Sequence, residues 1–284
     1  MPHTNVKEIL TKASEKKIGI ANMIGSDIAM TVGICKAAEV LRAPVILCFN
    51  QEVNPKIPIE IGIPMIVNAA ENSSVEIGTM LDHGKSFDEI KKAIELGIGS
   101  VMIDGSLLPF ETNVEITKGV VDYAHSKNIP VEGELGCISG SSIENIRAEK
   151  KSVFTQPEQA LDFIEKTNID FLAISFGNSH GSYFGLPKLD LSRVKEVKEK
   201  VKIPLVMHGA SGLNFEKYPE IINAGITKLN YYTAISEIVM KGLFLDVKDS
   251  EIMAIHELID HTIDGFFIQT KRLLTLFGSN NYYT

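Results

Sequence analysis

The sequence predicts an α/β fold, namely a single (β/α)8 TIM barrel with an additional C-terminal helix. The first observation is length, since one barrel of about 250 residues accounts for nearly all of the 284 residues. The second is continuity: no Gly/Ser-rich, Pro-rich or like-charged tract divides the chain. The third is alternation, because short apolar runs alternate eight times with helical patterns. We therefore expect one domain over residues 1–284.

The eight expected strands are near-continuous apolar runs, as is typical of parallel strands covered by helices. They are KIGIANM, PVILCFN, IGTMLDH, SVMIDG, PVEGELG, FLAISFG, PLVMHG and KLNYYT. Helices are expected where apolar residues recur at three- and four-residue steps, at 27–42, 87–97, 112–128, 157–168, 191–201 and 215–225. The link at 54–64 is the least helical. A doubly wound open sheet is the competing arrangement, but eight units close most naturally as a barrel.

The end of the chain reads as helix beyond the barrel. We expect residues 249–278 to form a C-terminal helical extension that packs on the barrel or on another subunit.

The formal charge of −8, from 28 basic and 36 acidic residues, argues against partners such as nucleic acid or anionic membrane.

Cysteine usage and the N-terminus bear on location. Cys35, Cys48 and Cys137 lack CxxC spacing and cannot all pair within the chain, which favours a reduced intracellular compartment. The polar N-terminus lacks the apolar core of a signal peptide, and no run of about 18 apolar residues is present. We expect a cytoplasmic protein without membrane spans.

Polar residues gather at the C-terminal ends of the expected strands, where parallel barrels carry their catalytic groups. His83, His180 and His208 would open onto one rim, and three imidazoles with an open fourth position are how catalytic zinc is held. Glu134 is a candidate to replace or supplement a ligand, and cobalt, iron or manganese also suit such donors. The other strand-end candidates are Asp82, Asp104, Ser106, Glu132, Asn230 and Thr233.

Asp82 and His83 are adjacent, so on an ideal strand their side chains would point to opposite faces. Both can face the site only if the strand ends there, and we expect Gly84 to permit that departure. The remaining histidines are expected in structural or surface roles, and they are His3, His125, His256 and His261.

Glycine-rich segments follow the sixth and seventh expected strands, as GNSHGSYFG and HGASGLN. Their backbone N–H groups can approach a phosphate closely, and Ser211 adds a hydroxyl. Thr233 at the end of the eighth strand agrees with the usual phosphate region of such barrels. A metal and a phosphate site on one rim imply a phosphorylated substrate. A Schiff-base mechanism is disfavoured because Lys228 begins its strand, at the wrong end for the site.

The sequence resembles the class II, metal-dependent ketose-bisphosphate aldolases over nearly its whole length. The motifs are GIAN, APVIL, LDHG, SVMIDGSLLPFETN, VEGELG, GNSHGSY, PLVMHGASGL, KLN and LFGS. Without large insertions, the chain looks most like the tagatose-type branch. The resemblance implies reversible cleavage of a ketose phosphate, such as fructose or tagatose 1,6-bisphosphate, to dihydroxyacetone phosphate and an aldehyde. It also implies Zn²⁺, a Na⁺ or K⁺ ion near the phosphate, and a homodimer or homotetramer.

The resemblance also implies roles for individual residues. His83, His180 and His208 would hold the zinc, with Glu134 close to the metal. Asp82 would exchange the proton of the C4 hydroxyl, and the zinc would polarise the C2 carbonyl. The substrate and its phosphate would meet Asn22, Gly181, Gly209, Ser211, Asn230, Tyr232 and Thr233.

The sequence departs from the family pattern at several positions. Ser142 stands where the family has a loop acid, and Glu144 is the expected substitute. Tyr232 occupies a position of aspartate or a small residue, Asn50 replaces a serine, and Phe184 stands where many members have lysine. One alternative is therefore the same scaffold acting on a different phosphorylated sugar or keto acid. Another is a non-catalytic sugar-phosphate binder, against which the retained Asp82 counts.

Overall fold

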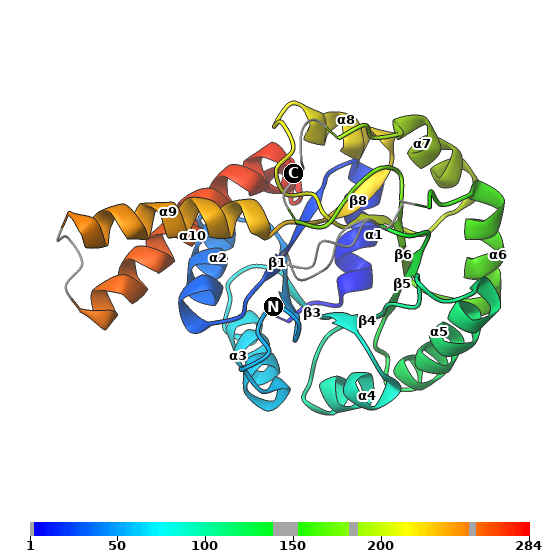
Figure 1. Cartoon of the computed structure of the whole chain (residues 1–284), viewed down its shortest axis with the longest axis horizontal. Helices are drawn as coiled ribbons and strands as arrows, with labels where there is room; N and C mark the ends of the chain where they lie inside the picture. Colours follow the sequence, from blue (N-terminus) through cyan, green and yellow to red (C-terminus); the bar gives the residue numbers. More distant parts are fainter. Residues whose placement is uncertain (1–2, 139–152, 182–186, 250–253) are drawn as a thin grey trace.

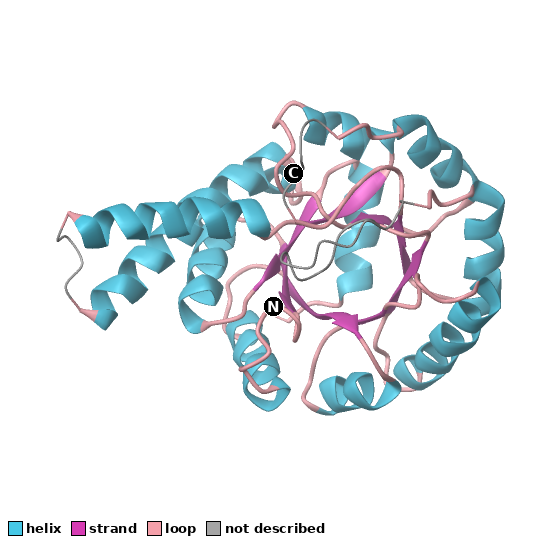
Figure 2. Ribbon diagram, in the orientation of Figure 1, coloured by secondary structure: helices cyan, strands magenta, loops and turns pink. Residues whose placement is uncertain are grey.

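The computed structural model describes residues 3–138, 153–181, 187–249 and 254–284. Within them, eight parallel strands close into a barrel in the order β1 to β8, which confirms the predicted (β/α)8 fold. Figure 2 shows the ring of strands with helices around it. The strands are β1 Ile20–Ile24, β2 Val45–Phe49, β3 Ile77–Gly84, β4 Val101–Ile103, β5 Val131–Leu135, β6 Phe171–Ile174, β7 Leu205–Met207 and β8 Ile226–Asn230.

Two apolar layers hold the barrel. Alternate strand residues point outward against the helices, such as Val45 and Leu47 of β2, or inward to the barrel interior, such as Ile46. Val6 and Ile9 of the first helix join the interior cluster, so this helix covers the N-terminal end of the barrel. The polar residues at the C-terminal ends of the strands therefore lie at the opposite end of the barrel.

The six helices expected between the strands are present, and α1 and α3, which were not among them, complete the barrel. The segment predicted as least helical, residues 54–64, overlaps the start of α3, which includes Pro64 and whose buried face carries Ile63 and Ile66. Ser86 caps α4 by accepting from the Glu89 N–H. The barrel helices are α1 Val6–Lys16, α2 Ile28–Leu41, α3 Ile59–Glu71, α4 Phe87–Glu95, α5 Phe110–His125, α6 Pro157–Thr167, α7 Leu191–Lys200 and α8 Lys217–Ala224.

Two helices beyond the barrel form an arm that projects to one side (Figure 1). α10, Ile255–Leu276, lies within the expected extension, and α9, Thr233–Lys248, precedes it without having been predicted. α10 packs on α2 at Gly33, where an added methyl carbon would come within 2.5 Å of the Ile263 carbonyl oxygen. In the described part of the chain, no helix combines the length and apolarity needed to cross a bilayer.

Candidate active site

A cavity of about 260 Å³ opens at the C-terminal ends of the strands. It brings the adjacent Asp82 and His83 together with His180 and His208, which are distant in the sequence. All the candidate substrate residues line it as well, namely Asn22, Gly181, Gly209, Ser211, Asn230, Tyr232 and Thr233. Glu144, Ser142 and Phe184 lie outside the described residues.

An irregularity in β3 turns both Asp82 and His83 toward this cavity. The pairing of β3 with β4 shifts register between Leu81 and Gly84, and His83 has a φ of 52°. The left-handed conformation falls on His83 itself, and Gly84 contributes by its missing side chain, because an added methyl carbon there would lie 2.7 Å from the Met102 carbonyl oxygen. A histidine in this region is uncommon and costs about 1–3 kcal/mol, which the surrounding structure must offset.

Gly209 and Asn178 bring the segments after β6 and β7 together. Gly209 has a φ of 66°, and an added methyl carbon there would lie 1.9 Å from the Ser179 carbonyl oxygen. The Asn178 side chain donates to the His208 carbonyl oxygen at 3.0 Å and accepts from the Phe176 N–H at 2.9 Å. These contacts fix His180 beside His208, and sequence reasoning missed the part played by Asn178.

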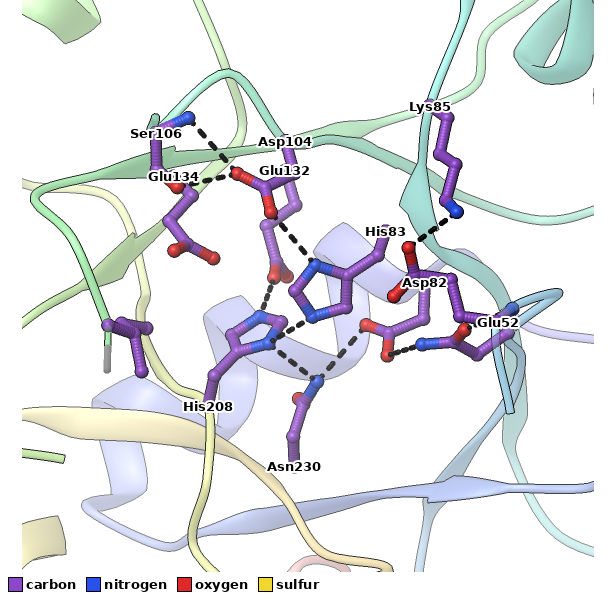
Figure 3. A network of polar contacts seen from close by, with 12 residues as sticks. Glu52, Asp82, His83, Lys85, Asp104, Ser106, Glu132, Glu134, His208 and Asn230 are labelled. Atoms are coloured by element: carbon purple, nitrogen blue, oxygen red, sulfur yellow. Dashed lines mark hydrogen bonds and ion pairs between the residues drawn. The ribbon is translucent and has the colours of Figure 1, made fainter. Parts of the chain in front are cut away.

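The three imidazoles turn nitrogen atoms toward one another, and Figure 3 shows two of them, those of His83 and His208. Asp104 bonds His83 through Nδ1 at 3.1 Å, and Glu132 bonds His208 through Nε2 at 2.8 Å. The other two nitrogens, His83 Nε2 and His208 Nδ1, lie 3.0 Å apart. Buried His180 Nε2 has no hydrogen-bond partner among the described residues. Carboxylates behind imidazoles are typical of metal sites, so this donor set fits a zinc ion.

The pKa shifts of the three histidines suit the binding of a cation. Burial, followed by repulsion from His83, lowers the pKa of His180 and of His208 well below the ordinary value, so both imidazoles are neutral. For His83, burial opposes charge, but Asp82 and Asp104 outweigh it and raise the pKa to about 10. The site thus attracts one positive charge, which a divalent ion would supply in place of that proton.

Asp82 is a buried carboxylate. Burial acts to raise its pKa, but His83, His208 and Lys228 together lower it below the ordinary value. Asn230 donates to Asp82 Oδ1 at 3.1 Å, and Asn50 donates to Oδ2 at 3.4 Å. The carboxylate is therefore held in place and able to accept a proton at the edge of the cavity.

Glu134 does not line the cavity. Its donor atom groups with those of His83 and Asp104, all within 4.8 Å of one another. Burial, then the nearby Asp104, raises the Glu134 pKa well above its ordinary value. Glu134 Oε2 has no hydrogen-bond partner in the described ranges. The carboxyl group therefore lies beside His83 and Asp104 and is not part of the group formed by the three imidazoles.

Lys228 corrects the sequence interpretation. It does not lie at the wrong end of β8: its side chain is fully buried, and Nζ lies 2.9 Å from both Glu132 Oε2 and Asn230 Oδ1. Residues 228 and 230 point the same way because strand side chains alternate. The lysine still makes a poor Schiff-base nucleophile, because that chemistry needs a neutral amine and Lys228 is paired with a carboxylate.

The remaining histidines do not line the cavity. His3 bonds Thr79, His125 bonds Asp170 and His261 bonds Asp246, while His256 is exposed on α10.

The cavity itself is anionic. In the parts of the chain described, its lining includes Glu52 and no lysine or arginine. Lys85 pairs with Glu52 at 2.5 Å from the solvent side.

Comparison with known proteins identifies the family. The class-II fructose-bisphosphate aldolase family matches residues 4–282. YdjI of Escherichia coli (strain K12) is 36% identical over 228 residues, covering 80% of this chain and 82% of YdjI. A fructose-bisphosphate aldolase of Staphylococcus epidermidis is 35% identical over 239 residues, 82% of each chain.

Solved structures support the same family assignment. The crystal structure of the YdjI aldolase superposes with a TM-score of 0.87 at 32% identity, over 99% of this chain and 98% of that one. A putative fructose-1,6-bisphosphate aldolase from Coccidioides immitis, 24% identical, has a TM-score of 0.88 over 97% of this chain and 96% of that one, which supports the fold alone. This chain belongs to the class-II fructose-bisphosphate aldolase family and is an aldehyde-lyase.

Proposed function

We propose that this protein is a zinc-dependent aldolase that reversibly cleaves a ketose (bis)phosphate, such as fructose or tagatose 1,6-bisphosphate, to dihydroxyacetone phosphate and an aldehyde. One observation carries the proposal: nitrogens of His83, His180 and His208 converge beside the Asp82 carboxylate. Zinc bound there would act as a Lewis acid that polarises the ketose carbonyl and stabilises the negative charge left on cleavage.

Asp82 is the proton-transfer group of this proposal. In cleavage its carboxylate takes the proton of the C4 hydroxyl as the C3–C4 bond breaks, and in condensation it returns that proton to the aldehyde oxygen. The amides of Asn230 and Asn50 orient it. Glu144, beyond the described residues, is proposed as the loop acid in place of Ser142.

The phosphate of the dihydroxyacetone half is proposed to sit between the segments after β6, β7 and β8. Gly181 and Gly209 offer close backbone approach, and Thr233 begins α9, whose N-terminus favours an anion. Ser211 Oγ accepts from the Tyr232 N–H at 3.0 Å, so its own hydroxyl proton can point to the phosphate. Asn22 would contact the substrate carbons, and a Na⁺ or K⁺ ion would neutralise part of the phosphate charge.

A second candidate is the same reaction on a different phosphorylated sugar or keto acid. Tyr232 and the Glu52 carboxylate line the cavity, and each alters the space around the aldehyde half of a substrate. A carboxylate there disfavours a second phosphate by like-charge repulsion. A non-catalytic sugar-phosphate binder is less well supported, because binding alone does not require the oriented carboxylate of Asp82.

We also propose a cytoplasmic homodimer or homotetramer. Cys35 and Cys48, which form no disulfide, are consistent with a reduced compartment. The exposed apolar residues of the arm are consistent with self-association.

The test combines metal analysis with a cleavage assay. Purified wild type should contain about one zinc per chain and release dihydroxyacetone phosphate from at least one phosphorylated ketose in a panel of 1-phosphates and 1,6-bisphosphates. His180→Ala should lose bound zinc and reduce turnover at least 100-fold, since three-ligand zinc sites depend on each ligand. His256→Gln, on the exposed face of α10, is the matched control and should keep both.

The outcomes separate the candidates. An active preparation without metal, unaffected by a chelator, would contradict the zinc proposal. Equal cleavage of fructose and tagatose bisphosphates at ordinary rates would remove the second candidate. Ligand-induced stabilisation without turnover on any member of the panel would favour a binder.

A further inference from the structure

A buried ion pair lies beneath the histidines, and the proposed reaction leaves it without a role. Glu132 of β5 and Lys228 of β8 face each other across the barrel interior, both with fully buried side chains. Lys228 Nζ lies 2.9 Å from Glu132 Oε2. A buried ion pair contributes little stability compared with apolar residues of similar volume, so its presence here requires another explanation.

Lys228 determines how the Asn230 amide is oriented. An ammonium group can only donate hydrogen bonds, so the atom of Asn230 that lies 2.9 Å from Lys228 Nζ must be the carbonyl oxygen, Oδ1. The amide NH₂ group then points the other way. It donates to Asp82 Oδ1 at 3.1 Å and lies 3.3 Å from His208 Nδ1.

Glu132 determines where His208 carries its proton. The carboxylate accepts from Lys228 through Oε2, and its other oxygen, Oε1, lies 2.8 Å from His208 Nε2. A carboxylate only accepts, so His208 Nε2 carries the hydrogen and Nδ1 keeps its lone pair. That lone pair faces the Asn230 NH₂ group and His83 Nε2. The orientation of Asn230 that Lys228 sets and the tautomer of His208 that Glu132 sets are therefore compatible, because the Asn230 NH₂ group faces the unprotonated Nδ1 of His208.

We propose that Lys228 and Glu132 are a pair of positioning residues that set the tautomer of His208 and the amide orientation of Asn230, and through Asn230 hold Asp82. The roles of His208 and Asp82 rest on the proposed function, whereas the tautomer and the amide orientation do not. Neither Lys228 nor Glu132 lines the cavity, so both act through the residues above them.

Glu132→Gln is the sharpest single test, because glutamine has the same shape but only one acceptor oxygen. Lys228 must keep that oxygen, so the new NH₂ group faces His208 Nε2 and forces the proton onto Nδ1. In the metal-free protein, ¹⁵N spectra of the imidazoles should show Nε2–H at His208 in wild type and Nδ1–H in Glu132→Gln. His125, held by Asp170 outside the cavity, is the internal control and should not change.

Zinc affinity gives a second readout. Competition with a chromophoric chelator should show roughly 10–100-fold weaker zinc binding in Glu132→Gln, the usual effect of losing a partner behind a metal ligand. If Glu132→Gln keeps Nε2–H at His208 and wild-type zinc affinity, the proposal is wrong.

The double variant Lys228→Met/Glu132→Leu separates positioning from packing. Lys228→Met alone leaves a buried unpaired carboxylate and should lower the thermal midpoint strongly. The double variant removes both charges and should recover most of that midpoint, while kcat stays roughly 10–100-fold below wild type with a smaller change in KM. Recovery of kcat together with stability would mean that the pair only fills the core, and would overturn the proposal.

Failure of the proposed function would look different. If wild type released no dihydroxyacetone phosphate from any ketose phosphate, the proposed function would fall, while the spectra and the chelator competition would still report on the pair. If the double variant does not fold, the decision rests on Glu132→Gln, whose spectra require no activity.

Discussion

At the scale of single residues, Gly209 controls how closely His180 approaches His208. Gly209→Ala would place a methyl carbon 1.9 Å from the Ser179 carbonyl oxygen, in a left-handed conformation that alanine rarely adopts. We expect a loss of about 1–3 kcal/mol in the free energy of unfolding. We also expect weaker zinc binding, because the two imidazoles are pushed apart. Denaturant titration and chelator competition measure the two effects.

The matched control is Gly119→Ala on the exposed face of α5. Apart from the adjacent residues and the backbone of α5 itself, no atom of the described residues lies within 4 Å of the added methyl carbon. Alanine in a helix interior should raise stability by about 0.5–1 kcal/mol and leave zinc binding unchanged. A Gly209→Ala variant as stable as this control would contradict the packing argument.

The same scale shows where sequence reasoning succeeds at the site. His83, His180 and His208 could be placed on one rim because each follows an expected strand, and strand ends share one side of a parallel barrel. Lys228 was misplaced because the expected strand KLNYYT begins at Lys228, whereas β8 begins at Ile226 and Lys228 is its middle residue. A long side chain reaches up the interior to Asn230, and alternation from Asn230 would have revealed the shared face.

At the scale of elements, the contact of α10 with α2 depends on Gly33. A side chain there meets the Ile263 carbonyl oxygen at 2.5 Å and Phe266 Cβ at 2.8 Å. Gly33→Leu should therefore displace α10 and lower stability by about 1–3 kcal/mol, as overpacking does. Hydrogen exchange should increase in peptides from α10 and less in those from α5. Gly119→Leu, with open space around it, is the control, and equal exchange in both variants would refute the prediction.

Strands and helices could be predicted from the sequence where the apolar residues recur at regular steps. The strands and most barrel helices alternate cleanly, so the barrel was predicted, whereas α3 was missed because Pro58 and Pro64 flank and interrupt its first turns. α9 was missed for a different reason. Apolar residues such as Met240 and Phe244 lie on its outer face and obscure the one-sided pattern expected of a helix that packs on a barrel.

At the scale of the whole molecule, that outer face of α9 predicts self-association. Phe244 is 64% exposed and Met240 is 61% exposed, and they line an apolar groove of about 600 Å³ that also includes Thr233 and Ser236 of the catalytic cavity. Apolar surface gathered on a projecting arm is stabilised when a second copy of the chain covers it. We expect light scattering coupled to gel filtration to give a dimer or tetramer for wild type.

The variant that tests this prediction places charge in the groove. Phe244→Glu would have to bury a carboxylate at the contact, so the mass should fall toward that of the monomer at micromolar concentration. Leu161→Glu is the control, since Leu161 is an exposed apolar residue on α6, across the barrel from the arm in Figure 1. A monomeric wild type, or an unchanged oligomer in Phe244→Glu, would show that the arm has another purpose. If dissociation also raises KM, then the shared Thr233 and Ser236 connect assembly to the shape of the catalytic cavity.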